Sequence, residues 1–482
     1  MDDRHRAFLE KTKHAAERIR EWILEGVPIT IFTHNDADAL SAAGILSGAL
    51  WREEAKFRCR SIHRIEEFLQ LHDSGYLNAD RIIFSDLGSG YIGELSGRLG
   101  DREIIILDHH EPRGEVLSGW VHVNPHLHGI DGTTELSASG VAYFVAKALN
   151  MDNVRYAPVA VVGALGDLQD KNTVRKLHGM NEIIVRDAVD NNLLITREDL
   201  VLYGRTFRPI HISLASTTSP FIPGLSGREE ACYNFIVSLG ITVKTDEQWR
   251  TLSDLTEEEK KRLFSGIVEY LVSHKLPAEI ANELIGTAYD LVGEEGWIYL
   301  RDAREFATLL NSCGKTGRAY LGISVAMGER GEILEEASKV LEEYRTNLAK
   351  TMDYVSRPGV IETLNHAIVL KGGGVIDEKQ ISSVASILSS SGMIPKDKPL
   401  IAVADAGHYV KVSARANRDL VNRGLDLGAI LAKLSAHHGG RGGGHNVAAG
   451  AEIPSDRLLR FLADFDRSVG EVLSFDGRAD KR

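Results

Sequence analysis

Short apolar segments that end in acidic or imidazole side chains constrain the fold of this chain more than any other feature. Runs of β-branched and aromatic residues without polar alternation are typical of buried parallel strands. The carboxyl ends of parallel strands meet at one edge of a sheet, where open α/β proteins bind ligands. We therefore predict an α/β fold with a parallel sheet and a site at that edge. The segments are ITIF (29–32) before Thr33-His34-Asn35-Asp36-Ala37-Asp38, IIF (82–84) before Ser85-Asp86, and IIIL (104–107) before Asp108-His109-His110.

A fourth acidic group, Asp167, follows the helical run of small residues 157–166. A single Asp in such a place is usually a turn former or a helix cap. Several carboxylates gathered in one cleft, however, repel one another unless cations neutralise them. A cluster of Asp and His without Cys suits borderline-to-hard divalent ions such as Mn²⁺ and Mg²⁺. We therefore predict a two-metal site at this edge of the sheet.

These residues resemble motifs one to four of the DHH phosphoesterase superfamily, in the order in which that family has them. The resemblance implies a hydrolase with two divalent cations, Mn²⁺ first and Mg²⁺ as the alternative. It also implies which side chains bind each ion. The implied metal ligands are His34 and Asp36 for one ion, Asp38, His109 and Asp167 for the other, and Asp86 as a bridge between both.

The same resemblance assigns catalytic roles to Asp86, Asp108 and His110. Asp108 would orient the neighbouring imidazole, since a ligating His needs a partner on its other ring nitrogen. His110 would face the scissile phosphate of the substrate. The three residues of the Asp108-His109-His110 run are thus expected to have three different tasks.

A glycine-rich segment near the carboxyl terminus, GGRGGGH at 439–445, is the second strong signal. Glycines let backbone N–H groups approach phosphate oxygens closely. Residues 401–450 carry six Lys or Arg against three Asp, a balance of +3 in a chain of net charge −12. The segment resembles the DHH-associated carboxy-terminal domain and its GGGH loop, which implies that it holds the sugar–phosphate backbone of the substrate. The implied substrate-binding residues here are Arg415, at the end of a predicted strand, and Gly442, Gly443, Gly444 and His445.

Residues 304–318 resemble a loop of RecJ-type single-strand exonucleases, and this resemblance places Asn311 and Lys315 in the substrate channel. The alternative is a helix that ends at a glycine cap. The layout resembles archaeal RecJ-like nucleases, including the type associated with the GINS replication complex. The expected domains are a DHH catalytic domain at 1–205, a mostly helical insert at 206–330, a linker helix at 331–355 and a DHH-associated domain at 356–482.

The composition is that of an ordinary intracellular protein. No apolar run reaches the length of a membrane span, and the amino terminus is a charged amphipathic pattern without a secretory core. Cys59, Cys232 and Cys313 are too far apart in sequence for a local zinc motif. We therefore expect a cytoplasmic protein without a membrane partner.

These features together lead us to expect a Mn²⁺- or Mg²⁺-dependent exonuclease on single-stranded DNA or RNA, acting in DNA replication or repair. One alternative is a phosphodiesterase for short oligoribonucleotides or cyclic dinucleotides, which uses the same two halves without a long channel. Another is a replication scaffold that keeps the fold without the chemistry. The insert is expected to bind a GINS-type complex. The polarity of cleavage and the choice between DNA and RNA stay open at this point.

Overall fold

The computed structural model describes residues 2–75, 79–100, 102–172, 174–217, 220–294, 296–390 and 393–475. Positions 476–482 of the expected carboxy-terminal domain therefore lie outside the described residues. The chain divides into two compact units. Unit 1 comprises Met1–Val201 and Ile285–Tyr344, and unit 2 comprises Leu202–Leu284 and Arg345–Arg482. None of the helices in the described ranges is long and apolar enough to cross a membrane.

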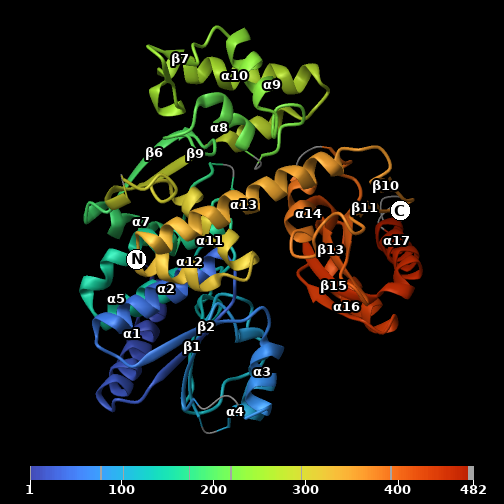
Figure 1. Ribbon diagram of the computed structural model, residues 1–482. Helices are drawn as coiled ribbons and strands as arrows, with labels where there is room; N and C mark the ends of the chain where they lie inside the picture. Colours follow the sequence, from blue (N-terminus) through green and yellow to red (C-terminus); the bar gives the residue numbers. More distant parts are fainter. Residues whose placement is uncertain are drawn as a thin grey trace. The chain divides into compact units, whose positions relative to one another are not determined.

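A five-stranded parallel sheet forms the centre of unit 1, with strand order β2-β1-β3-β4-β5 (Figure 1). The predicted α/β fold with a parallel sheet is thus confirmed. The chain runs from β1 outward to β2 and then returns to β3 on the other side of β1. The loops after β1 and β3 therefore leave in different directions and open a crevice at the carboxyl edge. The strands are β1 (Ile29–Thr33), β2 (Phe57–Ser61), β3 (Arg81–Ser85), β4 (Glu103–Leu107) and β5 (Val121–Val123).

Helices cover both faces of this sheet, which explains why its strands are apolar on both sides. Ile29 and Ile31 of β1 pack in one core, whereas Phe32 packs in the core of the opposite face. Both cores exclude water from the sheet, and only the strand ends stay polar. The first core is formed with α1 (Asp3–Leu24), α2 (Ala37–Arg52), α5 (Ala138–Leu149), α6 (Ala157–Gly166) and α7 (Met180–Asp190), and the second with α3 (Ile65–Asp73) and α4 (Ile92–Leu99).

Unit 1 is completed by a segment that returns after a long excursion of the chain. Strand β6 (Leu194–Leu200) pairs antiparallel with β9 (Ile285–Leu291), so the chain leaves and re-enters unit 1 at one strand pair. The expected insert, 206–330, is longer than this excursion, because β9 and the helices after it pack with unit 1. These helices are α11 (Ala303–Lys315), α12 (Ala319–Met327) and the first part of α13 (Glu332–Val355).

Residues 304–318 differ from the expected RecJ-like loop, because most of them are helical. Helix α11 begins after Asp302, whose carboxylate accepts hydrogen bonds from the backbone N–H groups of Arg304 and Glu305, and it continues to Lys315. One face of the helix is buried against α6 and α2. The alternative of a helix that ends near a glycine is thus the observed one, with Gly317 in the left-handed region.

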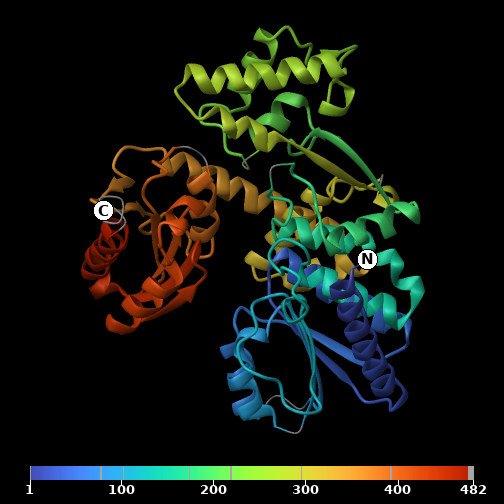
Figure 2. The same ribbon diagram turned by 180° about the vertical axis from the view of Figure 1, so that it is seen from behind.

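The excursion at 202–284 belongs to unit 2 and is mostly helical (Figure 2). Thr256 forms a reciprocal capping box with Glu259 at the start of the longest helix of the excursion. The elements are α8 (Ile210–Ser216), α9 (Glu229–Ser238), the hairpin of β7 (Lys244–Thr245) and β8 (Gln248–Trp249), and α10 (Glu257–Ser273).

The remainder of unit 2 is built on a six-stranded sheet of order β10-β11-β12-β13-β15-β14, in which only β11 and β12 are parallel. The expected glycine-rich loop is an edge strand, β14, because its backbone pairs antiparallel with β15. The strands are β10 (Ile361–Thr363), β11 (Ile368–Lys371), β12 (Leu400–Asp405), β13 (Tyr409–Arg415), β14 (Arg441–Gly444) and β15 (Ala448–Pro454), and the helices are α14 (Ile381–Ser390), α15 (Arg418–Asn422), α16 (Leu427–His437) and α17 (Leu458–Phe475).

Candidate metal centre

The loop between β1 and α2 brings three predicted ligands to the crevice. Asp36 is the N-cap of α2, where its Oδ1 accepts a hydrogen bond from the backbone N–H of Ala39 at 2.9 Å. Its other oxygen, Oδ2, lies 3.0 Å from Nδ1 of His34. Asp38 is buried in the first turn of α2 and accepts hydrogen bonds from two backbone N–H groups at the start of α5. These hydrogen bonds therefore orient all three side chains toward one place.

Asp86, directly after β3, occupies the centre of this place. Its backbone is in the left-handed region, with φ of 60°, which is costly for a residue other than glycine. Its Oδ1 is buried, lies 3.2 Å from Nε2 of His109, and accepts no hydrogen bond of good geometry among the described residues. Burial, together with the charge of Asp36, raises the pKa of Asp86 to about 7. An unsatisfied buried carboxylate among other acids is an environment suited to a cation.

His109 presents one particular nitrogen to the centre. Its Nδ1 lies 2.7 Å from the backbone carbonyl of Gly132, so this nitrogen carries the proton and donates it. Its Nε2 is then left to face Asp86 and the Oδ2 of Asp38, which is 3.9 Å away. A Cβ at position 132 would lie 2.0 Å from the carbonyl oxygen of His109, so only glycine allows this approach.

Asp108 orients His110 and the loop backbone, whereas we expected it to orient the metal-binding imidazole. Its Oδ1 accepts from Nδ1 of His110 at 2.8 Å and from the backbone N–H of His109 at 2.8 Å. Its Oδ2 accepts from the backbone N–H of Ser89 at 2.9 Å. Although burial alone lowers the pKa of His110, the adjacent Asp108 carboxylate raises it to about 9. His110 is therefore a cation at neutral pH, and its side chain is 43% exposed.

Asp167 approaches the centre from the end of α6. Its Oδ2 lies 3.7 Å from Nδ1 of His109 and accepts a hydrogen bond from Gln169 at 2.9 Å. The same Gln169 amide donates to the carbonyl of Gly132, so it ties the Asp167 loop to the loop that orients His109. Burial and the nearby charge of Asp38 raise the pKa of Asp167 to about 6, against the lowering effect of His109.

The six predicted metal ligands are therefore gathered in one crevice, in two groups. In each group the ligand atoms lie within 4.8 Å of one another. Asp86 belongs to the first group and lies next to His109 of the second, as a bridging carboxylate would. Oxygen-rich groups with one imidazole each fit divalent cations of the Mn²⁺ and Mg²⁺ kind. The groups are His34 with Asp36 and Asp86, and Asp38 with His109 and Asp167.

Helix α11 holds the loops that carry these ligands, which the sequence pattern alone did not indicate. Asn311 accepts a hydrogen bond through its Oδ1 from the backbone N–H of Ala37, between Asp36 and Asp38, at 3.0 Å. A Cβ at Gly314 would lie 1.6 Å from the carbonyl oxygen of Asn35, so the helix backbone touches the loop. Asn311, expected in the substrate channel, therefore caps α2 and positions the ligand loop.

A buried ion pair connects the start of α11 to the loop that carries Asp167. The guanidinium of Arg304 lies 2.5 Å from Oδ2 of Asp170, and Arg175 approaches the same oxygen to 3.8 Å. Arg304 also donates to the carbonyl of Thr287 on β9. Loss of one partner in such a pair leaves a buried charge without compensation.

The predicted substrate-binding residues of unit 2 lie on its sheet. The Arg415 guanidinium at the end of β13 donates to the hydroxyl groups of Ser382 and Ser386 on α14. Gly444 has φ of 139°, and a Cβ there would lie 2.7 Å from Cα of Ala449. The close pairing of β14 with β15 therefore requires glycine independently of any ligand. Gly442 and Gly443 lie in the same strand, and His445 follows it. Lys315, the other predicted substrate-binding residue, is the last residue of α11 and belongs to unit 1.

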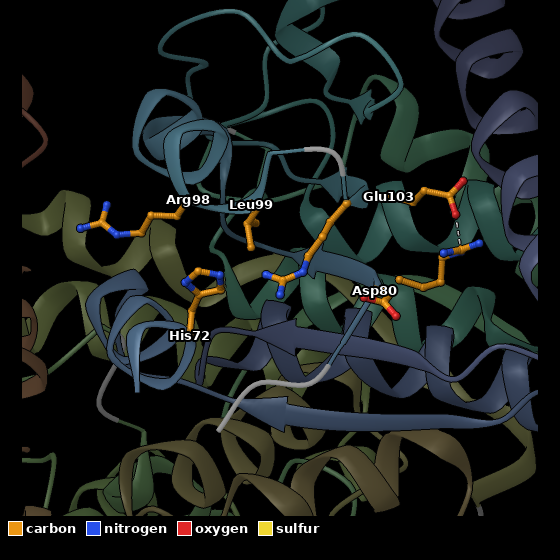
Figure 3. A pocket seen from close by; sticks show the side chains of 7 residues that line it. His72, Asp80, Arg98, Leu99 and Glu103 are labelled. Atoms are coloured by element: carbon orange, nitrogen blue, oxygen red, sulfur yellow. Dashed lines mark ion pairs between the residues drawn. The ribbon is translucent and has the colours of Figure 1, made fainter. Parts of the chain in front are cut away.

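A separate hollow of about 530 Å³ is lined by Asp80, Arg98, Glu103 and neighbouring side chains (Figure 3). Arg81 and Glu103, which line it, are the first residues of β3 and β4. The hollow is therefore at the amino edge of the sheet, opposite to the strand ends that carry the acids. Its arginines are partly neutralised, since Arg81 pairs with Glu25 at 2.8 Å and Arg98 with Asp73 at 3.6 Å.

Family models match two segments of the chain, which fall almost entirely in unit 2. The DHH-CID domain matches residues 202–285, and the DHHA1 domain matches residues 365–471. The uncharacterized protein MJ0831 of Methanocaldococcus jannaschii is 32% identical over 471 residues, which cover 96% of this chain and 99% of that protein. The chain belongs to the same family as this protein, within the DHH superfamily, and has a RecJ-like fold.

Solved structures share this fold at low sequence identity. RecJ from Thermus thermophilus in complex with Mn²⁺ has a TM-score of 0.57 at 18% identity over 96% of this chain, which spans 55% of that protein. CDC45 from Entamoeba histolytica has a TM-score of 0.65 at 14% identity, over 95% of this chain and 99% of that one. An exonuclease RecJ bound to manganese has a TM-score of 0.53 at 18% identity, with coverage of 95% and 94%.

We predict that Asn311→Ala lowers the affinity for Mn²⁺ by about 10–100-fold, as loss of an outer partner of a metal ligand does. The substitution removes the acceptor for the N–H between two predicted ligands. Asn311→Asp keeps the acceptor oxygen and should retain the affinity. Isothermal titration calorimetry with Mn²⁺ measures both. Equal affinities of Asn311→Ala and the parent protein would refute the positioning role.

We also predict that Mn²⁺ binding releases protons below pH 7. The metal needs charged carboxylates, whereas the pKa of Asp86 is about 7 in the absence of metal, so part of its population is protonated there. Affinity for Mn²⁺ therefore rises as the pH rises from 6 to 8. Calorimetry in buffers of different ionisation enthalpy counts the protons, and Asp86→Asn should release fewer. A proton count that Asp86→Asn leaves unchanged would contradict this assignment.

Proposed function

We propose that this protein is a divalent-cation-dependent exonuclease that hydrolyses phosphodiester bonds of single-stranded DNA or RNA from an end, in DNA replication or repair. One observation carries the proposal: two ligand groups meet in one crevice with a buried, unsatisfied Asp86 oxygen beside both. A phosphoesterase needs this arrangement, because the transferred phosphoryl group and the attacking water both need charge stabilisation. The DHH superfamily fold shared with RecJ supports the hydrolase class.

The roles of the individual residues follow from their protonation and contacts. When bound, two divalent cations would supply an activated water and neutralise phosphate charge. Gly132 keeps the proton of His109 on Nδ1, which leaves Nε2 to serve as a ligand. Asp108 keeps His110 protonated, so its imidazolium can donate to a phosphate oxygen as negative charge grows there. We assign Asp86, Asp108 and His110 to catalysis on these grounds.

Unit 2 is proposed to hold the nucleic-acid strand. The relevant groups are the Arg415 guanidinium, the backbone of β14 and His445. We assign these groups to substrate binding and not to the hydrolysis step. A cationic side chain and a glycine-rich backbone on the same sheet suit a sugar–phosphate chain rather than a base. Because such contacts ignore base identity, we expect cleavage without strong sequence preference.

A non-catalytic scaffold is the second candidate, because the structure of CDC45 also shares the fold. A scaffold has no need to hold carboxylates in a buried crevice against their mutual repulsion. Here every predicted ligand is present, and backbone donors, helix caps and α11 hold the ligands in place. We therefore favour the enzyme. A phosphodiesterase for short oligoribonucleotides or cyclic dinucleotides would use the same centre.

The insert at 202–284 is proposed to bind a GINS-type replication complex. Tyr233 and Trp249 are 38% and 47% exposed, and their rings contact that of His211, the first edge-on and the second at a tilt. Partly exposed Trp and Tyr side chains are the residues that most often dominate protein interfaces. The patch carries both signs of charge, because Glu229 acts on His211 and the Nζ of Lys244 lies 5.6 Å from the centroid of the Trp249 ring.

We predict that Trp249→Ala weakens binding of the purified GINS complex about tenfold or more, as loss of an interface anchor does. Trp51→Ala, which removes a 72% exposed tryptophan from α2 in unit 1, is the matched control and should leave binding unchanged. Surface plasmon resonance with immobilised complex measures both. Unaltered affinity of Trp249→Ala would exclude this patch as the contact.

We predict that Asp86→Ala and His109→Ala each lower the release of mononucleotides from labelled single strands with Mn²⁺ by about 100-fold or more, since loss of an outer partner alone costs 10–100-fold. Asp190→Ala, which removes an exposed carboxylate of α7, serves as control and should retain full activity.

Three results of this assay distinguish the candidates. Full cleavage by both variants would refute the metal assignment, and no cleavage by any form, including the parent protein, would favour the scaffold. Hydrolysis of dinucleotides but not of longer strands would favour the short-substrate phosphodiesterase. Blocking the 5′ or the 3′ end of the labelled strand determines polarity in the same experiment.

A further inference from the structure

A second group of metal-ligating side chains lies in unit 2 and takes no part in the proposed hydrolysis. His437, His438 and Asp464 each offer one ligand atom, and these atoms lie within 4.8 Å of one another. Donors bound to a tetrahedral Zn²⁺ at about 2.0–2.1 Å lie roughly 3.3–3.5 Å apart. Small side-chain rotations therefore suffice to close the group around an ion.

The two histidines stand at the end of α16 and the aspartate on α17, which packs against it. Nε2 of His438 lies 2.9 Å from Oδ2 of Asp464. The His438 ring is held edge-on by Phe461 and is 6% exposed, so its direction is set by packing. His437 is exposed, which leaves the group open to an ion and to water on one side. The group thus has one potential metal ligand that is held rigidly, His438, and one that is accessible, His437.

The electrostatic surroundings favour a cation at this place. A helix carboxyl terminus carries partial negative charge, and His437 is the last residue of α16. Asp464 adds a full negative charge. Arg467, one turn further along α17, already contacts the other oxygen of Asp464, and its side chain is 66% exposed. An exposed arginine can move into solvent, so it competes with a metal ion without excluding it.

We propose that His437, His438 and Asp464 form a transition-metal site, of the Zn²⁺ class, that is separate from the acid-rich centre of unit 1. Two imidazoles with one carboxylate select Zn²⁺ or its neighbours over Mn²⁺ and Mg²⁺, which prefer oxygen ligands. A bound ion would fasten the end of α16 to α17. Because β14 begins four residues after His437, the ion would also anchor the start of the glycine-rich strand.

Metal-free full-length protein titrated with Zn²⁺ in equilibrium dialysis, and with Co²⁺ followed by visible absorption, tests the proposal. The parent protein is compared with His437→Ala, which removes an exposed side chain and leaves the core intact, and with His438→Gln, whose amide can still donate to Asp464. His408→Ala, which removes an exposed histidine from the same unit, is the matched control. The centre in unit 1 is the same in all four proteins, so differences in stoichiometry report on this site.

We expect the parent protein and His408→Ala to bind one equivalent of Zn²⁺ more than His437→Ala and His438→Gln, with a matching loss of the Co²⁺ absorption of four-coordinate sites. Arg467→Ala removes the competing cation and should tighten binding at this site about tenfold, which corresponds to roughly 1.4 kcal/mol. Equal stoichiometry in all four proteins would overturn the proposal. So would weaker binding by Arg467→Ala, because the arginine would then support the ion instead of competing with it.

Discussion

Repulsion among buried carboxylates at the carboxyl edge of one parallel sheet is the constraint on which the rest of unit 1 depends. Most of these acids are compensated by backbone donors: Asp38 by the start of α5, and Asp108 by the N–H groups of Ser89 and His109. Asp86 is the exception, since its Oδ1 accepts no hydrogen bond of good geometry from the residues that the structure describes, and its backbone is held in an unfavourable conformation. The remaining electrostatic cost is therefore larger at Asp86, whose pKa is raised to about 7, than at Asp167, whose pKa is raised to about 6. A divalent cation relieves that cost, and this is why we connect the geometry with phosphoryl chemistry.

The loops that carry the acids are held by parts of the chain far away in sequence. Helix α11 reaches the β1–α2 loop through Asn311 and the Asp167 loop through the ion pair of Arg304 with Asp170. Short loops between strand and helix rarely keep several charged side chains in register by themselves, and supporting contacts are needed to fix them. Loss of a contact more than a hundred residues away can therefore disturb the metal centre while the sheet stays intact.

Much of this arrangement could be predicted from the sequence, because it depends on local patterns. Apolar runs that end in Asp or His locate the strand ends, and parallel strands bring those ends together whatever the length of chain between them. The parts that could not be predicted depend on distant partners. Gly132 orients His109 through its backbone carbonyl. Every residue has such a carbonyl, so the amino-acid sequence does not indicate this contact. Residues 441–444 become a strand only because β15 lies beside them, and Asn311 caps a helix that begins some 270 residues earlier.

The pairing of β6 with β9 has a consequence for the order in which the protein assembles during synthesis. All proposed ligands of the centre in unit 1 precede residue 168, yet α11, which holds their loops, is made only after the whole of 202–284 has been translated. The insert therefore emerges from the ribosome while unit 1 is still incomplete. The crevice reaches its final form only when α11 has been synthesised and has packed against unit 1. A nascent chain that stops within the insert would carry every ligand but no finished centre. Domains usually fold in the order in which they are made, and here the first domain must wait for the second.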